Sequence, residues 1–254
     1  KWLGTIVKEM PIELDSEAAR FGGFNREDVL AVLRDFEFSS LVNRIPGQAA
    51  VQGSLLGDDG DSAQRAADSN SQRDYQIVDT TGALSAMVEE LHAAGSFAFD
   101  TETDSLDAMR ANLVGLSFSP SAGRSFYVPV GHIQGTQLSL GEVLESLKPL
   151  LEDPSLGKVA HNANYDMMVL ANYDIQVRGL DFDTMVAAHL ASRTGTGLKG
   201  LTFNVLHEEM TPITELIGTG RKQITFDQVP IEQAAPYAAA DADMTGQLRE
   251  ALEP

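Results

Sequence analysis

The chain has 254 residues, enough for one full domain with additional material or for two small domains. It contains no cysteine, which excludes disulfides, thiolate catalysis and cysteine-based zinc sites. Its 37 acidic and 18 basic residues give a formal net charge of −19. Taken alone, this charge argues against a nucleic-acid partner, because Lys and Arg supply most of the non-specific affinity for phosphate.

The N-terminal part of the chain is predicted to be helical. Asn25 stands before a set of apolar residues with helical periodicity and is a candidate N-cap. Residues 1–45 are too few for a core of their own, and the start at Lys1 is interpreted as that of a fragment. Residues 46–74 have no aromatic and little apolar content, so we predict a flexible linker there.

Residues 75–254 are predicted to form one compact α/β domain. A helix over 81–95 precedes three strands at 96–102, 112–119 and 125–130, whose short connections favour an antiparallel meander. The later elements are helices at 138–151, 162–173, 184–192, 199–208 and 230–252 and strands at 158–161 and 180–182. Because crossover helices add parallel strands, the predicted fold is a mixed sheet of three antiparallel strands followed by αβα units.

Asp100 and Glu102 lie two residues apart on an otherwise apolar predicted strand. Side chains alternate along a strand, so both carboxylates point the same way and Thr101 points away from them. Two neighbouring like charges on a central strand are costly unless a cation neutralises them. For this pair alone, a strand edge with both acids in water is the favoured alternative.

Two predicted helices carry further acids at helical spacing. Asn162 and Asp166 are four residues apart, as are Tyr237 and Asp241, so each pair shares a helix face. Taken alone, each pair also fits a simpler alternative. Asp166 would be solvated on a helix that Asn162 caps, and the second helix would be amphipathic with a core tyrosine and an exposed aspartate.

The combination favours catalysis over these alternatives. Four carboxylates supply the oxygen ligands that suit Mg²⁺ or Mn²⁺. Two such ions roughly 3.5–4 Å apart can activate a water and stabilise a leaving 3′ oxygen in phosphodiester hydrolysis. A phenol hydroxyl beside that water can orient it. The acidic composition then reflects metal binding, with DNA affinity supplied by another domain.

Three segments resemble the exonuclease motifs of the DEDD superfamily: 97–106 (FAFDTETDSL), 162–166 (NANYD) and 237–241 (YAAAD). The tyrosine four residues before the last aspartate marks the DEDDy branch, because the histidine branch has His where Pro236 stands. Residues 75–254 are similar to the proofreading 3′-5′ exonuclease domain of bacterial family A DNA polymerases, the DNA polymerase I family. Residues 1–45 resemble, less specifically, the C-terminal end of the 5′-nuclease domain of that family.

The resemblance implies an RNase H-like (DnaQ-like) fold and two divalent metal ions. These would be Mg²⁺ or Mn²⁺, with Zn²⁺ as a further candidate. Asp100, Glu102 and Asp241 would bind the tighter ion, and Asp166 would help to hold the second. Together with Tyr237, these four acids form the predicted catalytic set.

The resemblance also assigns residues to the substrate. Leu106 and Asn162 match positions that contact the terminal nucleotides, and Thr101 and Tyr237 are assigned to the substrate as well. Leu106 would act as an apolar wedge against a frayed base, in keeping with stacking recognition of single strands.

The implied function is removal of nucleoside monophosphates from a single-stranded or frayed DNA 3′ end. This would be proofreading within a monomeric polymerase whose polymerase domain follows in cis. A bacterial, cytoplasmic and nucleoid-associated protein is implied, and no run of about 18 apolar residues predicts a membrane span. Two alternatives stay open: a ribonuclease D-like 3′ exoribonuclease and a non-catalytic spacer domain.

Other polar residues are predicted to be structural or solvated. They are Asp104 and Asp107 in turns, Asp183 as a helix N-cap, Asp243, His132, His189 and His207. A small basic cluster at Arg221 and Lys222 fits a contact with DNA phosphate and simple solvation equally well.

Overall fold

The computed structural model describes residues 24–36, 38, 41, 45, 73–193 and 195–253 of the chain. The chain divides into two compact units, Lys1–Ile45 and Pro46–Pro254. In the first unit, helix α1 (Arg26–Asp35) follows Asn25, whose Oδ1 accepts a hydrogen bond from the backbone N of Glu27 at 2.9 Å, as an N-cap does. The predicted linker falls almost entirely outside the described residues, and its flexibility stays a prediction.

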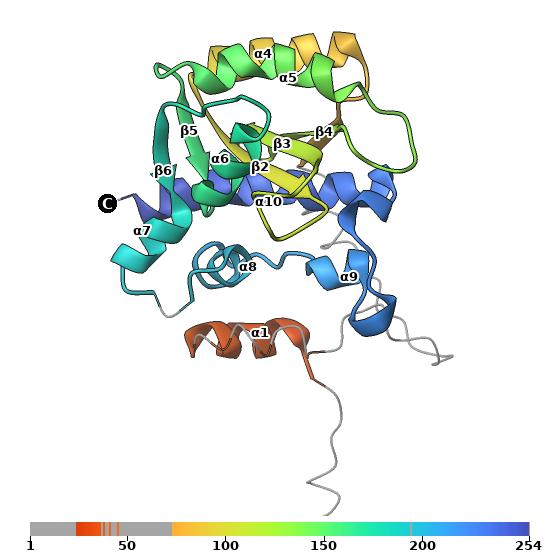
Figure 1. The fold of residues 1–254 in the computed structure, drawn as a ribbon. Coiled ribbons are helices and arrows are strands. Elements are labelled where there is room, and N and C mark those ends of the chain that lie inside the picture. The colour runs from red at the N-terminus through yellow and green to blue at the C-terminus, as the bar shows by residue number, and fades with distance from the viewer. Residues whose placement is uncertain are drawn as a thin grey trace, which may run out of the picture. The chain divides into compact units, whose positions relative to one another are not determined.

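A six-stranded sheet lies at the centre of the second unit (Figure 1). The strands are β1 (Asp74–Ile77), β2 (Ser96–Thr103), β3 (Leu113–Ser121), β4 (Arg124–Pro129), β5 (Gly157–Ala160) and β6 (Leu180–Asp183). Their order in the sheet is β1-β4-β3-β2-β5-β6. β2, β3 and β4 form the predicted antiparallel meander, and β5 and β6 extend the sheet from β2 in parallel. The predicted mixed sheet is therefore confirmed.

Helices cover both faces of this sheet (Figure 1). The longer ones are α4 (Thr81–Ala94), α5 (Leu140–Glu152) and α10 (Ile231–Leu252), and the shorter ones are α6 (Ala163–Ala171), α7 (Thr184–Leu190), α8 (Leu198–Leu201) and α9 (Ile213–Ile217). α4 and α5 bury the larger apolar core with alternate residues of β2 and β4, such as Phe99 and Phe126. α10 packs on the opposite face, where it meets Tyr127. The predicted helix over 199–208 is instead α8 followed by a π-helix at Thr202–Leu206, and α9 was not expected.

Small side chains bring α10 close to the sheet. Ala238 and Ala242 are fully buried. A Cβ added at Gly246 would meet the Cβ of Ala98 on β2 at 3.5 Å, which is already van der Waals contact. This close approach holds the middle of α10, which carries Tyr237 and Asp241, directly against β2.

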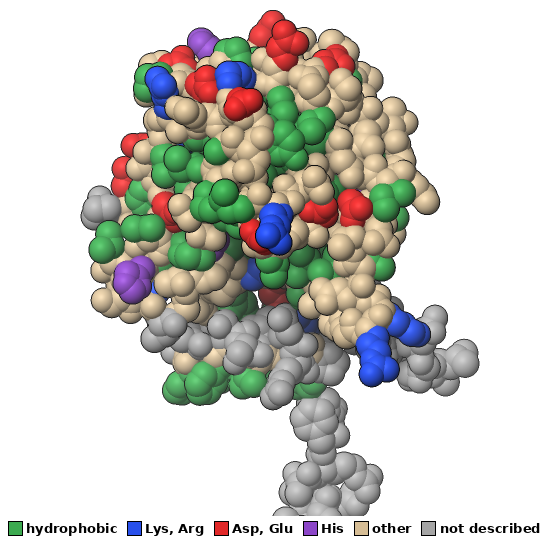
Figure 2. Space-filling view, in the orientation of Figure 1, with side chains coloured by type: hydrophobic (Ala, Val, Ile, Leu, Met, Phe, Trp, Pro, Cys, Tyr) green, Lys and Arg blue, Asp and Glu red, His purple; other side chains and the backbone are tan. Residues whose placement is uncertain are grey.

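The surface reflects the acidic composition. Acidic side chains are spread over the face shown in Figure 2, and Lys and Arg side chains lie singly or in small groups between them. Among the described residues, no helix is both long and apolar enough to cross a bilayer.

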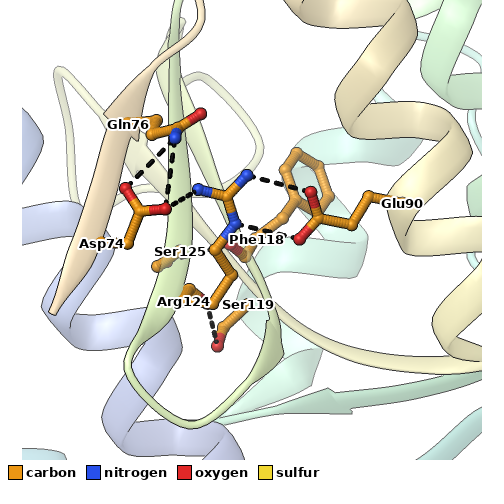
Figure 3. Close-up of polar contacts among 7 residues, drawn as sticks. All are labelled: Asp74, Gln76, Glu90, Phe118, Ser119, Arg124 and Ser125. Carbon is orange, nitrogen blue, oxygen red and sulfur yellow. Dashed lines mark hydrogen bonds and ion pairs between the residues drawn. The ribbon is translucent and has the colours of Figure 1, made fainter. Parts of the chain in front are cut away.

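Strand β1 was not expected from the sequence. Its four residues do alternate, with Tyr75 and Ile77 as the apolar pair, but the run is short and mostly exposed. It pairs in parallel with β4. Arg124 of β4 joins β1 to the rest of the domain (Figure 3). Its guanidinium forms an ion pair with Asp74 on β1. It also donates to both carboxylate oxygens of Glu90 on α4, and these two hydrogen bonds are each 2.9 Å long. A bidentate pair of this kind has a defined geometry and is stronger than a simple surface ion pair.

Arg124→Met is therefore expected to lower the free energy of unfolding by about 1–2 kcal/mol, because it removes several charge-assisted hydrogen bonds at once. Urea denaturation followed by circular dichroism measures this change. Arg110→Met is the matched control, because the Arg110 side chain is 86% exposed and lies 3.9 Å from Asp107. Equal stability of the two variants would show that the Arg124 cluster adds nothing to the fold.

Candidate active site

Three carboxylates converge near the carboxyl end of β2. Asp100 and Glu102 share one face of the strand, and Asp241 reaches them from α10. One carboxylate oxygen of each residue lies within 4.8 Å of those of the other two. Glu102 is 8% exposed and the Asp241 side chain 13%, so these charges are close together and largely shielded from water. The structure thus brings together three of the four predicted metal ligands.

The fourth predicted ligand, Asp166, comes from α6, which packs into the core on the α4–α5 side of the sheet. Asp166 is 2% exposed. Its Oδ1 accepts hydrogen bonds from the backbone N of Thr101 at 3.0 Å and from Thr101 Oγ1 at 2.5 Å. Thr101 therefore points away from Asp100 and Glu102, as strand alternation predicts, and it fixes the position of Asp166. The contact of Thr101 with substrate stays a prediction, and the structure gives its hydroxyl a different partner.

Tyr237 lies one helical turn before Asp241 and is 9% exposed. Its ring packs against Phe226, with the two centroids 5.9 Å apart. Lys199 Nζ donates a hydrogen bond to the phenol oxygen at 3.1 Å and lies 3.6 Å from Asp241 Oδ1. Sequence reasoning missed Lys199, because a single lysine in a short segment between glycines carries no pattern that separates it from a solvated one.

Leu106 stands in the loop between β2 and β3. Its side chain is 98% exposed, and Met109 in the same loop is 65% exposed. The base of the loop is anchored, because Tyr165 of α6 donates its hydroxyl proton to the backbone O of Ser105 at 2.5 Å. The structure therefore presents an apolar side chain to solvent on a supported loop, while the wedge role of Leu106 stays a prediction.

Asn162 precedes α6 in a left-handed conformation, with φ 62°, and its side chain makes no capping hydrogen bond. The backbone N groups of Asn162 and Ala163 donate instead to Asp183, at 3.2 and 2.8 Å. Asp183 also accepts from the backbone N of Met185 at 2.9 Å, so the predicted N-cap of α7 is confirmed. The Asn162 side chain is exposed and does not cap α6, so the alternative in which Asn162 is only a helix cap is not supported.

Asp243 has a structural role in the described part of the domain. It is fully buried and accepts hydrogen bonds from the Tyr75 hydroxyl at 2.7 Å and the Gly123 backbone N at 2.9 Å, which ties α10 to β1 and to the β3–β4 turn. His132 is also structural, because its ring contacts the Tyr127 hydroxyl at 2.6 Å and a backbone oxygen at 2.8 Å.

Comparison with known proteins shows the family to which the domain belongs. Residues 75–254 match the family described as 3′-5′ exonuclease. The chain carries a 3′-5′ exonuclease domain. The chain is 41% identical over 276 residues to DNA polymerase I of Chloroflexus aurantiacus, a match covering 99% of this chain and 29% of that protein. It is 36% identical over 257 residues to DNA polymerase I of Pseudomonas aeruginosa, covering 98% and 27%. The chain thus spans less than a third of either relative.

Solved structures show the same fold as the exonuclease domain. Trypanosoma brucei RNase D in complex with RNA U12 matches with a TM-score of 0.59 and 20% identity, over 74% of this chain and 66% of that one. The POL domain of Pol1 from M. smegmatis, in complex with DNA primer-template and dNTP, matches with a TM-score of 0.52 and 22% identity, over 70% and 27%. The predicted RNase H-like fold is confirmed.

Burial and mutual repulsion dominate the electrostatics of the site. Burial raises the pKa of Asp100 and of Glu102 well above their usual range, and the neighbouring carboxylates Asp166 and Asp241 raise them further. Burial also raises the pKa of Asp166 to about 7 and that of Asp241 to about 6, with Lys199 opposing the rise at Asp241. The folded domain therefore resists full ionisation of its acids unless positive charge is added.

The donor set fits a divalent cation. All its ligand atoms are carboxylate oxygens, the type that Mg²⁺ and Mn²⁺ prefer. The inaccessible Oδ1 of Asp241 accepts no hydrogen bond, although Lys199 is near it. A buried polar atom without a hydrogen-bond partner is uncommon in folded proteins and is consistent with a ligand position.

The metal-free domain is expected to lose stability as the pH rises from about 4 to about 7. The pKa values of Asp166 and Asp241 are higher in the folded state than their ordinary value of 3.8, so the folded state binds more protons within this window. The loss is of the order of a few kcal/mol. Carboxyls whose pKa is lowered in the folded state, such as Glu90, gain stability as the pH rises and so oppose this loss. The decisive quantity is therefore the difference in stability between samples with EDTA and with Mg²⁺ at each pH.

Thermal unfolding at pH 5 and pH 8, with EDTA and with Mg²⁺, measures this effect. Mg²⁺ should raise Tm strongly at pH 8 and little at pH 5, because metal binding requires deprotonated ligands. Asp241→Asn should reduce the rise at pH 8. A Mg²⁺ effect of the same size at both pH values would contradict the prediction.

Proposed function

We propose that the exonuclease domain removes nucleoside monophosphates from DNA 3′ ends with two bound divalent metal ions, Mg²⁺ or Mn²⁺, as the proofreading part of a longer DNA polymerase. The observation that carries the proposal is the convergence of Asp100, Glu102 and Asp241 in a chain 41% identical to a DNA polymerase I. A monomer in the bacterial cytoplasm, at the nucleoid, is part of the same proposal. The polymerase domain would follow in cis.

Each acid has a role in this proposal. Asp100, Glu102 and Asp241 hold the tighter ion, and Asp166, fixed by Thr101, helps to hold the second. Two divalent ions at such a site supply activation of the attacking water and stabilisation of the leaving 3′ oxygen.

Tyr237 orients the attacking water and does not act as a base. Burial raises the pKa of its phenol far above neutrality, and the charges of Asp241, Glu102 and Asp100 raise it further. The hydroxyl therefore keeps its proton at neutral pH. Because its oxygen accepts a hydrogen bond from Lys199, its own proton is directed to a different acceptor.

The substrate enters as an unpaired end. Leu106 acts as an apolar wedge against a frayed base, and Leu106 and Asn162, whose side chains are both exposed, contact the terminal nucleotides. Stacking and apolar contact contribute about 1–3 kcal/mol per base, but only for unpaired bases. A mismatched terminus melts at a lower cost than a paired one, which biases the site toward errors.

Binding of the isolated domain to DNA is expected to be weak and only slightly dependent on salt. The net charge is −19, and basic side chains are sparse on the face in Figure 2, so counterion release supplies little affinity. Titration of single-stranded, mismatched and matched DNA at two salt concentrations, with Ca²⁺ to suppress cleavage, tests this. Tighter binding to matched duplex, or a steep salt slope, would indicate a basic binding surface instead.

Degradation of 5′-labelled oligonucleotides tests the function itself. DNA with a mismatched 3′ end should be shortened one nucleotide at a time with Mg²⁺ and not with EDTA. The alternative, a ribonuclease D-like exoribonuclease, draws on the structural match to an RNase D–RNA complex. Faster degradation of an RNA of the same sequence would favour that alternative.

A further inference from the structure

The side chain of Lys199 reaches into the acidic site. Lys199 Nζ lies 3.1 Å from the Tyr237 hydroxyl, 4.2 Å from the centroid of the Tyr237 ring and 3.6 Å from Asp241 Oδ1. Its side chain is 32% exposed. Lys199 therefore forms a hydrogen bond and a cation–π contact with Tyr237 and an ion pair with Asp241. A lysine that is only solvated makes no such set of contacts.

The packing of α8 against α10 and α7 places Lys199 beside Tyr237 and Asp241. Lys199 lies in α8, whose Leu201 is buried against Leu248 of α10 and Ala188 of α7, with Leu198 packed at the edge of the same cluster. A π-helix at Thr202–Leu206 continues the chain directly after α8. Such local widening of a helix is frequent at functional sites, because it redirects the side chains around it.

The charge of Lys199 acts on the whole cluster. Its Nζ lies 3.6 Å from Asp241 Oδ1, and one carboxylate oxygen each of Asp100, Glu102 and Asp241 lie within 4.8 Å of one another, so the positive charge stands beside all three acids. Its hydrogen bond also occupies the phenol oxygen of Tyr237 as an acceptor, so the tyrosine must direct its own proton elsewhere. One side chain thus acts on both the carboxylates and the tyrosine.

We propose that Lys199 is a positioning residue of the exonuclease site, which holds the Tyr237 hydroxyl in its working orientation and balances the charge of the carboxylates before metal binds. This rests on the proposed exonuclease function. Lys199 acts through Tyr237 and Asp241 and needs no contact with substrate. An ordinary exposed ion pair at the same distance would have almost no effect on rate or stability.

A double-mutant cycle tests the link to Tyr237. Lys199→Met should lower kcat by about 10-fold to 100-fold with little change in KM, because loss of alignment costs rate on this scale. In a Tyr237→Phe background the same change should lower kcat by no more than about threefold, because the hydroxyl that Lys199 holds is gone. Lys199→Arg, which keeps a charged donor, should restore part of the rate.

Lys148→Met is the matched control, because it removes the same positive charge at a place away from the site. Lys148 forms an i,i+4 ion pair with Glu152 on α5, with Nζ and Oε1 3.3 Å apart. Lys148→Met should leave kcat unchanged in both backgrounds. An equal loss of kcat from Lys199→Met with and without the Tyr237 hydroxyl would overturn the proposal, and so would no loss at all.

A second measurement separates this proposal from the proposed function. In EDTA at pH 8, Lys199→Met should lower Tm, and saturating Mn²⁺ should remove most of the difference from the wild type, whereas Lys148→Met should show no such metal dependence. If the wild-type domain degraded neither DNA nor RNA, the proposed function would fail while this result still supported Lys199 as the internal counter-charge. An unchanged metal-free Tm in Lys199→Met would overturn the proposal whatever the activity.

Discussion

Asp241→Ala is expected to lower the exonuclease rate by about a thousandfold or more while the domain stays folded. Asp241 is one of three carboxylates whose oxygens lie within 4.8 Å, so its loss leaves two ligands for the tighter ion. Metal ions contribute several kcal/mol to such reactions, and about 4 kcal/mol corresponds to about a thousandfold in rate. In EDTA, Tm should hold or rise, because the change also removes carboxylate repulsion. Single-turnover degradation and thermal unfolding measure the two effects.

Asp243→Ala is the informative comparison, because it lies two residues further along the same helix. Its carboxylate accepts hydrogen bonds from Tyr75, Gly123 and Gln247. Loss of these bonds should lower the free energy of unfolding by about 2 kcal/mol or more and leave the metal affinity nearly intact. Near-normal cleavage by Asp241→Ala, or loss of metal binding only in Asp243→Ala, would show that the metal ligands are assigned wrongly.

The part of the site that depends on local periodicity could be predicted from the sequence. Strand alternation places Asp100 and Glu102 on one face and Thr101 on the other, and helical spacing places Tyr237 and Asp241 one turn apart. Both relations are confirmed, because they are set by the backbone within a single element. The antiparallel meander is confirmed for a similar reason, since short connections leave few other pairings.

Features that depend on tertiary packing could not be predicted in this way. Lys199 reaches the site only because Leu201 is buried against Leu248, 47 positions away in the chain. Strand β1 is a short and mostly exposed segment, which pairs with β4 and is held there by Arg124. Asp166 meets Thr101 across 65 positions. In each case the partner, and not the local sequence, determines the structure.

Tyr237→Phe is expected to lower kcat by about 10-fold to 1000-fold and to leave metal affinity within about threefold of the wild type. The phenylalanine ring keeps the contact with Phe226 and the place beside Lys199, so packing changes little. Only the hydroxyl is lost, and with it the donor that orients the attacking water. Because the phenol keeps its proton at neutral pH, the pH dependence of the remaining activity should keep the shape set by the carboxylates.

Tyr75→Phe is the matched control for this change. The Tyr75 hydroxyl donates its proton to Asp243 of α10, and this hydrogen bond helps to hold β1 in place. Tyr75→Phe should therefore lower Tm and leave kcat unchanged, whereas Tyr237→Phe should do the reverse. Mn²⁺ titration completes the test. If metal affinity in Tyr237→Phe falls as far as the rate does, the tyrosine supports the metal ligands and does not orient the water.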